Sequence, residues 1–193
     1  PPYGADYQSN RRWKTKAPDK IANDGGEEAM NLLASVLAIA VPKLANEAHC
    51  LIFCNWQNEP KVREIAERAG LKVKGSLIWI KEEHSAGDVK GAFAPRHERI
   101  VHAVKGSPEV IPRIPDVLEV ARSRESSHPM EKPVELLKRL ILSTSSDGDM
   151  VIDPFAGQGS TLVAALTTNR DIWGCELDEG HWEAGTVRLL KSR

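Results

Sequence analysis

The amino-acid sequence predicts an α/β fold with a mostly parallel sheet and an antiparallel hairpin at one edge. Two observations carry this prediction. Apolar runs of strand length alternate with segments of helix length, as expected when helices connect parallel strands. In addition, the strand-like segments GSLIWIK and RIVHAVKG are close enough in the chain to pair around residues 82–98. The 193 residues suit one domain, spanning 1–193.

The first half of the chain begins with a predicted helix over residues 24–45. Asp24 and Glu27 form a capping-box pattern, and an apolar stripe of helical spacing follows, made of Met30, Leu33, Leu37 and Val41. The run HCLIFCNW is apolar almost throughout, which is typical of a buried strand in a parallel sheet. EPKVREIAERAG is a predicted short helix, with Pro60 in its first turn and Gly70 as its stop.

The second half begins with a proline-containing segment, residues 106–127, for which we expect a loop with one short helix. The remaining elements alternate regularly. The sequence predicts, in order, a helix in EKPVELLKRLILSTS, a strand in DMVIDPF, a helix in STLVAALTTN, a strand in DIWGCEL and a helix in EGHWEAGTVRLLKS.

Charge and cysteine content exclude several function classes. The formal net charge is -1, so no global basic field favours nucleic acid, and contact with a polyanion requires a local patch. Cys50 and Cys54 would lie ~13 Å apart on one strand, too far for a disulfide. Without a C-x-x-C pair we expect neither a zinc nor a redox site. The small number of cysteines, without an expected disulfide, fits a reducing, cytoplasmic compartment. No signal peptide or membrane-length apolar run is present.

A glycine-rich turn, DPFAGQGST, lies between a predicted strand and a predicted helix. Gly157 and Gly159 would let a ligand approach the backbone at the helix start. The third position of the dinucleotide fingerprint is Leu162, which argues against a dinucleotide. Nineteen residues after Gly157, Glu176 ends the next strand, where an acidic residue grips ribose hydroxyls. S-adenosylmethionine, with a ribose and a small carboxylate, suits both features; the alternative is a tight turn with a surface glutamate.

Three segments, in this order, carry a resemblance to a known family. PPYG at residues 1–4, HPMEKPVELLKRLI at 128–141, and DPFAGQGST followed by GCELDEGHW together resemble the β-group of amino-methylating DNA methyltransferases. The resemblance spans essentially the whole chain. It implies a Rossmann-like S-adenosylmethionine-dependent methyltransferase fold and methyl transfer to an exocyclic amine of DNA.

The resemblance assigns the first segment a catalytic role, carried by Pro1, Pro2 and Tyr3. The carbonyl of Pro1 would accept from the target amine, and the ring of Tyr3 would stack on a base flipped out of the duplex. Members of the family carry Asp or Ser before the two prolines, at the end of a central strand. We therefore expect that this chain is part of a longer protein, or that residues precede Pro1.

The resemblance also implies the sites for cofactor and DNA. Eight residues would line the cofactor, with Glu176 on the ribose and Lys132 near the methionine carboxylate: His128, Lys132, Asp153, Phe155, Ala156, Gly157, Gly159 and Glu176. A small target-recognition segment would lie at about 106–127. The expected DNA contacts are Arg11, Arg12, Lys14, Lys16, Arg113, Arg122 and Arg124. Because this segment is short, we expect further DNA contacts from the NRRWKTK segment, from a second protomer or from residues before Pro1, and we favour a homodimer.

The leading hypothesis is therefore a double-stranded DNA adenine-N6 methyltransferase that uses S-adenosylmethionine and no metal. Cytosine-N4 methylation is the alternative. In the family, the residue before the two prolines discriminates between the bases: Asp favours adenine and Ser favours cytosine. Cytosine-C5 chemistry would need a nucleophilic cysteine near Pro1, and none is there. The sequence is also compatible with an RNA target, and with a non-catalytic module that kept the fold.

Overall fold

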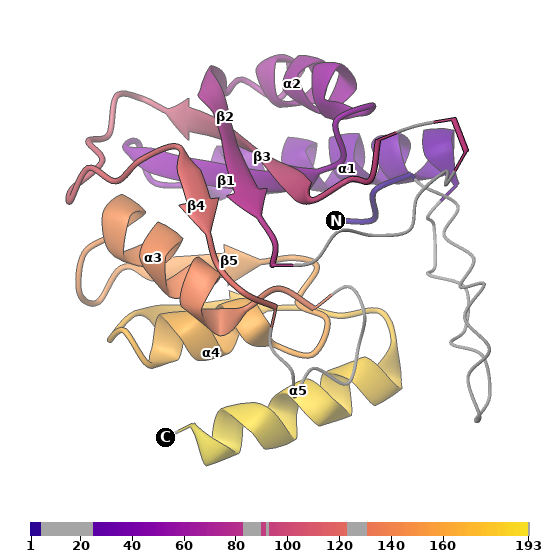
Figure 1. Ribbon diagram of the computed structural model, residues 1–193. Coiled ribbons are helices and arrows are strands. Elements are labelled where there is room, and N and C mark those ends of the chain that lie inside the picture. Colours follow the sequence, from indigo (N-terminus) through magenta and orange to yellow (C-terminus); the bar gives the residue numbers. More distant parts are fainter. Residues whose placement is uncertain (5–24, 83–89, 92, 123–130, 193) are drawn as a thin grey trace. The chain divides into compact units, whose positions relative to one another are not determined.

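The structure is a computed structural model that describes residues 1–4, 25–82, 90–91, 93–122 and 131–192 (Figure 1). The chain divides into two compact units, one of Pro1–Ser76 with Arg99–Ser107 and the other of Leu77–Glu98 with Pro108–Arg193. One sheet has the strand order β1-β3-β2-β4, and a second sheet consists of β5 and β6. Strands β2 (Lys72–Ile80) and β3 (His97–Lys105) each run from one unit into the other.

The first unit packs two helices on an antiparallel pair of strands. It contains α1 (Gly26–Ala40), the short 3-10 helix η1 (Val41–Lys43), β1 (Ala48–Cys54) and α2 (Glu59–Arg68). β1 pairs with β3 over its whole length. The core joins the predicted stripe of α1 to one face of these strands and to α2; its most deeply buried members include Ala29, Leu33, Val62, Ala66, Val101 and Ala103.

The second unit contains a parallel β-α-β arrangement. β5 (Met150–Asp153) pairs in parallel with β6 (Asp171–Gly174), and α4 (Ser160–Leu166) connects them. Helix α4 packs on α3 (Val134–Thr144), and α5 (Glu179–Lys191) packs on α4. The alternation predicted for the second half of the chain is therefore confirmed. The glycine-rich turn follows the end of β5, and the end of β6 comes later in the chain, after α4.

Helix α1 ends earlier than the sequence predicts. Pro42 lacks an amide hydrogen and its ring crowds the carbonyl of Ala38, so the α-helix stops at Ala40 and continues only as η1. The Lys105 ammonium donates to two carbonyls near this end, Val41 O at 3.2 Å and Leu44 O at 2.8 Å. The expected capping residue Asp24 lies outside the described residues.

The segment after the hairpin forms a strand where one short helix was predicted. β4 (Val117–Glu119) pairs in parallel with β2 and lies beyond it in the sheet order. Three prolines precede this stretch, and Val117–Val120 alternates between exposed and buried positions, a period of two that suits a strand. The indole Nε1 of Trp79 donates to Val120 O at 2.8 Å and fixes the strand's end.

Strand β1 also differs from the expectation of a fully buried parallel strand. Its described ladder, with β3, is antiparallel, and most of its side chains are only partly buried. The β2–β3 hairpin has the predicted antiparallel connection, since Lys81 N donates to Arg96 O at 2.9 Å. No helix in the described part of the chain is long and apolar enough to span a membrane.

A histidine pair on β1 and β3 makes the stability of the first unit depend on pH. His49 Nδ1 lies 2.9 Å from His102 Nε2, and the rings stack at 5.2 Å. Burial lowers the pKa of His102, and the nearby His49 and Lys74 lower it further. Below the ordinary histidine pKa of about 6.5 the unfolded chain binds this proton more readily than the folded chain. We therefore expect the free energy of unfolding to fall as the pH drops below that value.

Urea unfolding across this pH range measures the effect. His102→Gln should remove much of the pH dependence, whereas His97→Gln, at an exposed position on β3, should leave it in place. Equal pH slopes for the wild type and His102→Gln would contradict the assignment.

Candidate functional site

The glycine-rich turn follows β5 directly and is closed by its own hydrogen bonds. Asp153 ends the strand, and its Oδ1 accepts from Phe155 N at 2.9 Å. Gly159 N donates to Ala156 O at 2.8 Å. Gly157 has φ +52°, and a Cβ built on it would meet no atom within 4 Å. The backbone at Gly157 therefore faces open space, as needed for close approach of a ligand.

Glu176, at the end of β6, contacts this turn. Its Oε2 accepts from Gly157 N at 2.7 Å, while its Oε1 accepts from Leu177 N at 2.9 Å and Asp178 N at 3.0 Å. A carboxylate has about four acceptor positions, so these three bonds leave one for a hydroxyl group. The sequence spacing predicted that Gly157 and Glu176 serve the same ligand, and in the structure the two residues are in direct contact.

Helix α5 packs closely against the far side of the same turn. Gly159 has φ +76° and precedes α4, and a Cβ built on it would lie 3.4 Å from Gly185 Cα. A Cβ on Gly185 would lie 3.1 Å from the carbonyl carbon of Gln158. The two backbones meet at glycines, and a side chain on Gly185 would force the backbone of the turn to shift slightly.

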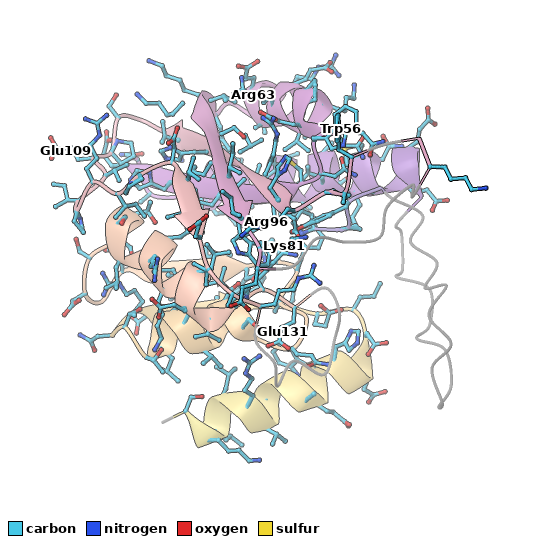
Figure 2. All side chains as sticks on the ribbon, in the orientation of Figure 1. Trp56, Arg63, Lys81, Arg96, Glu109 and Glu131 are labelled. Carbon is cyan, nitrogen blue, oxygen red and sulfur yellow. The ribbon has the colours of Figure 1, made fainter. Side chains whose placement is uncertain are left out.

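A second contact joins the turn to the segment before α3. Glu131 Oε1 accepts from Ser160 Oγ at 3.0 Å and pairs with Arg188 Nη1 at 2.5 Å. Arg188 also donates to Ser160 Oγ at 3.0 Å. Figure 2 labels Glu131. These three residues were not predicted as site residues, because their pairing joins positions far apart in the chain.

Lys132 lies in a buried group of charges. Its Nζ is 3.0 Å from Glu98 Oε2, and Lys81 Nζ is 2.6 Å from Glu98 Oε1. Both ammonium groups lie over the ring of Trp79, and Arg122 Nη2 lies 3.7 Å from Glu98 Oε1. Burial lowers the pKa of Lys132, while the Glu98 carboxylate acts in the opposite direction. Among the described residues, the Glu98 carboxylate is therefore shared by three basic side chains.

The structure therefore gives Lys132 the partner Glu98, which the sequence did not indicate. The role of Lys132 toward a cofactor carboxylate stays a prediction. Lys81, labelled in Figure 2, directly follows β2 and was not proposed for any site. Its separation from Glu98 and Lys132 in the sequence explains why no local pattern showed the group.

The PPYG segment belongs to the first unit, where two asparagines hold it. The carbonyl of Tyr3 accepts from Asn58 Nδ2 at 2.7 Å and from Asn55 Nδ2 at 3.3 Å. Asn55 Oδ1 in turn accepts from Asn58 N at 2.8 Å. Pro1, Pro2 and Tyr3 are partly exposed. The asparagines were missed. Asn55 lay inside the predicted strand HCLIFCNW, which ends at Cys54 in the structure, and Asn58 follows that strand, where ligand-binding loops of α/β proteins lie.

The predicted DNA contacts divide between described and undescribed residues. Arg113 is exposed, and Arg122 is half exposed beside Glu98. Their role with DNA stays a prediction. Six predicted residues lie outside the described part: Arg11, Arg12, Lys14, Lys16, Arg124 and His128. Among the described residues, no group of three or more His, Cys, Asp and Glu could hold a metal ion.

Comparisons with known proteins agree with one another. A family model described as DNA methylase matches residues 1–186. YubD of Escherichia coli (strain K12) is 35% identical over 190 residues, which cover 98% of this chain and 78% of that protein. The DNA adenine methyltransferase YhdJ of the same strain is 43% identical over 63 residues, covering 33% of this chain and 21% of that protein.

Solved structures show the same fold. The crystal structure of an M1.HpyAVI–SAM complex has a TM-score of 0.72 at 22% identity and covers 80% of each chain. The cytosine-N4-specific PvuII DNA methyltransferase has a TM-score of 0.75 at 14% identity, covering 92% of this chain and 76% of that one.

Proposed function

This chain belongs to the DNA methylase family of N6 and N4 amino-methyltransferases, and on that premise we propose that it methylates the N6 amine of adenine in double-stranded DNA. S-adenosylmethionine is the proposed methyl donor. The observation that carries the proposal is the contact between Glu176 and Gly157 at 2.7 Å, beside a turn with open space above its backbone.

The residues of this turn fit S-adenosylmethionine. Glu176 has one acceptor position left for a ribose hydroxyl, and Gly157 has no side chain to block a ligand. When bound, the cofactor would supply a methyl group on a positively charged sulfur. The M1.HpyAVI structure, of similar fold, was solved with SAM. Phe155 and Ala156, in the same turn, and Asp153 before it are the proposed neighbours of the ligand; His128 and Lys132 are proposed for its methionine end.

The PPYG segment is proposed to act on the target base. An exocyclic amine is a weak nucleophile, because its lone pair is delocalised into the ring. The Pro1 carbonyl would accept a hydrogen bond from that amine and leave the lone pair free to attack the methyl carbon. The ring of Tyr3 would stack on the flipped base. Catalysis of this kind consists mainly of positioning and electrostatic stabilisation.

The choice of adenine is supported by the match with YhdJ, a DNA adenine methyltransferase. Cytosine-N4 methylation is the second candidate, supported by the fold shared with the PvuII enzyme. We further propose a homodimer, because the segment 106–127 offers few side chains for base contacts. A reducing, cytoplasmic setting is in keeping with Cys50, Cys54 and Cys175, none of which forms a disulfide in the structure.

The test is transfer of a labelled methyl group from S-adenosylmethionine to duplex DNA, followed by digestion to nucleosides. N6-methyl-2′-deoxyadenosine is the expected product. N4-methyl-2′-deoxycytidine would support the second candidate. Absence of label from duplex DNA, with label in RNA or in neither, would overturn the proposal and favour an RNA target or a non-catalytic module.

Tyr3→Ala should lower kcat for DNA methylation far more than it lowers affinity for the cofactor. Stacking of one base on an aromatic ring stabilises by ~1–3 kcal/mol, which corresponds to roughly 5- to 150-fold in rate. Steady-state kinetics and calorimetry with S-adenosylmethionine measure the two quantities separately. Tyr3→Phe retains the ring and is the matched control. Weaker cofactor binding with unchanged kcat would assign Tyr3 to the cofactor site.

A further inference from the structure

The carbonyl of Tyr3 has two side-chain donors, both from the turn that follows β1. The Asn58 amide is 2.7 Å away and the Asn55 amide 3.3 Å away. The same turn carries Trp56, an exposed aromatic labelled in Figure 2. All of these residues belong to the first unit, so the contact lies within one compact body.

Two donors on one carbonyl fix the orientation of the peptide plane between Tyr3 and Gly4. The next residue adds a second constraint, because Gly4 has φ +65° and a Cβ built on it would lie 3.1 Å from both Asn58 Nδ2 and Gly26 Cα. The backbone on the carboxyl side of Tyr3 therefore has little freedom. Since the side chain leaves from the same Cα, its direction is restricted as well.

The asparagines are themselves held in place. Asn55 Oδ1 accepts from Asn58 N at 2.8 Å, which closes the turn before α2 and orients the Asn55 amide. Asn55 therefore uses its oxygen within the turn and its nitrogen on the Tyr3 carbonyl. This division matters for the test, because Asn55→Asp keeps the oxygen that accepts from Asn58 N and replaces the donor to Tyr3 O with a charged oxygen.

We propose that Asn55 and Asn58 are positioning residues that hold Tyr3 in the orientation required to stack on the target base. The inference rests on the proposed function. Neither asparagine touches the reacting atoms; both act through the Tyr3 backbone. A fixed platform lowers the cost of placing the base before methyl transfer, so loss of the donors should reduce kcat rather than cofactor binding.

The variants are Asn58→Asp, Asn55→Asp and Asn58→Leu, assayed for methyl transfer to duplex DNA. Asn58→Asp replaces the donor with an oxygen that repels the carbonyl, and Asn58→Leu removes it without adding charge near DNA. We expect kcat to fall about five- to tenfold for both, as for loss of one well-placed hydrogen bond. Asn55→Asp should have a smaller effect, because its bond to Tyr3 is longer. KM for S-adenosylmethionine should change less than twofold.

Asn31→Asp, the same charge change at an exposed position on α1, is the matched control and should retain full kcat. Thermal unfolding of every variant separates positioning from folding. If the wild type methylates DNA and both Asn58 variants retain its kcat, the inference is overturned. It is also overturned if kcat, cofactor binding and the unfolding temperature fall together, since the asparagines would then serve folding. An inactive wild type would instead overturn the proposed function.

Discussion

Glu98→Ala is expected to lower the free energy of unfolding by about 3–5 kcal/mol, the cost typical of removing one partner from a buried ion pair. The Glu98 side chain is only 9% exposed, and the lysines paired with it are 10% and 16% exposed. Without the carboxylate, Lys81 and Lys132 would both lose their ion pair with Glu98, in a buried place above the ring of Trp79. Urea unfolding followed by tryptophan fluorescence measures the change.

The same variant should show a characteristic pH dependence. Burial already lowers the pKa of Lys132, and Glu98 opposes that shift. Removal of Glu98 lowers the pKa further, so the folded variant releases its proton at lower pH than the unfolded chain does. Its stability therefore rises with pH, and the difference from the wild type should narrow as the pH approaches the ordinary lysine pKa of about 10.4.

Glu135→Ala is the control for this experiment. Glu135 pairs with Arg139 on the exposed side of α3, and exposed pairs contribute only about 0–1 kcal/mol. A loss below about 1 kcal/mol in Glu98→Ala would mean that water reaches the charged group and that the lysines need no buried partner.

Glu176→Ala is expected to weaken S-adenosylmethionine binding by roughly 10- to 150-fold, equivalent to ~1.5–3 kcal/mol for a lost charge-assisted hydrogen bond. The substitution removes the proposed acceptor for the ribose. It also removes the partner of Gly157 N, Leu177 N and Asp178 N, so the turn loses one of its hydrogen bonds to the segment after β6, while Ala156 N still donates to Cys175 O. Both effects act in the same direction on affinity.

Calorimetric titration with S-adenosylmethionine measures this loss. Glu179→Ala, at an exposed position in the first turn of α5, changes the charge by the same amount nearby and should leave the affinity unchanged. Equal affinities for Glu176→Ala and the wild type would remove Glu176 from the cofactor site.

The β-α-β arrangement around the glycine-rich turn was predictable because its signals are local. The two glycines follow one predicted strand, and the acidic residue follows the next. Because β5 and β6 pair in parallel, their ends lie side by side, which brings the glycines and the acidic residue close together. The approach of Glu176 to Gly157 follows from that geometry. The end of α1 was also readable in principle, because Pro42 is a local obstacle to the helix.

The pairings that could not be predicted join distant parts of the chain. Glu98 meets Lys132, Glu131 meets Arg188, and Asn58 meets the carbonyl of Tyr3. A charged residue in a polar stretch gives no sign of whether it will face water or a partner on another element. The short strand β4 was missed for a related reason, since three residues carry little periodic signal and its partner β2 lies far back in the sequence.

The glycine contact between α4 and α5 has a practical consequence for protein engineering. Gly185 lies within α5, and its backbone supports the turn at Gln158 and Gly159. Helix α5 therefore helps to support the glycine-rich turn. A fusion junction, an added cysteine for labelling or a shortened end belongs beyond Lys191, where α5 ends.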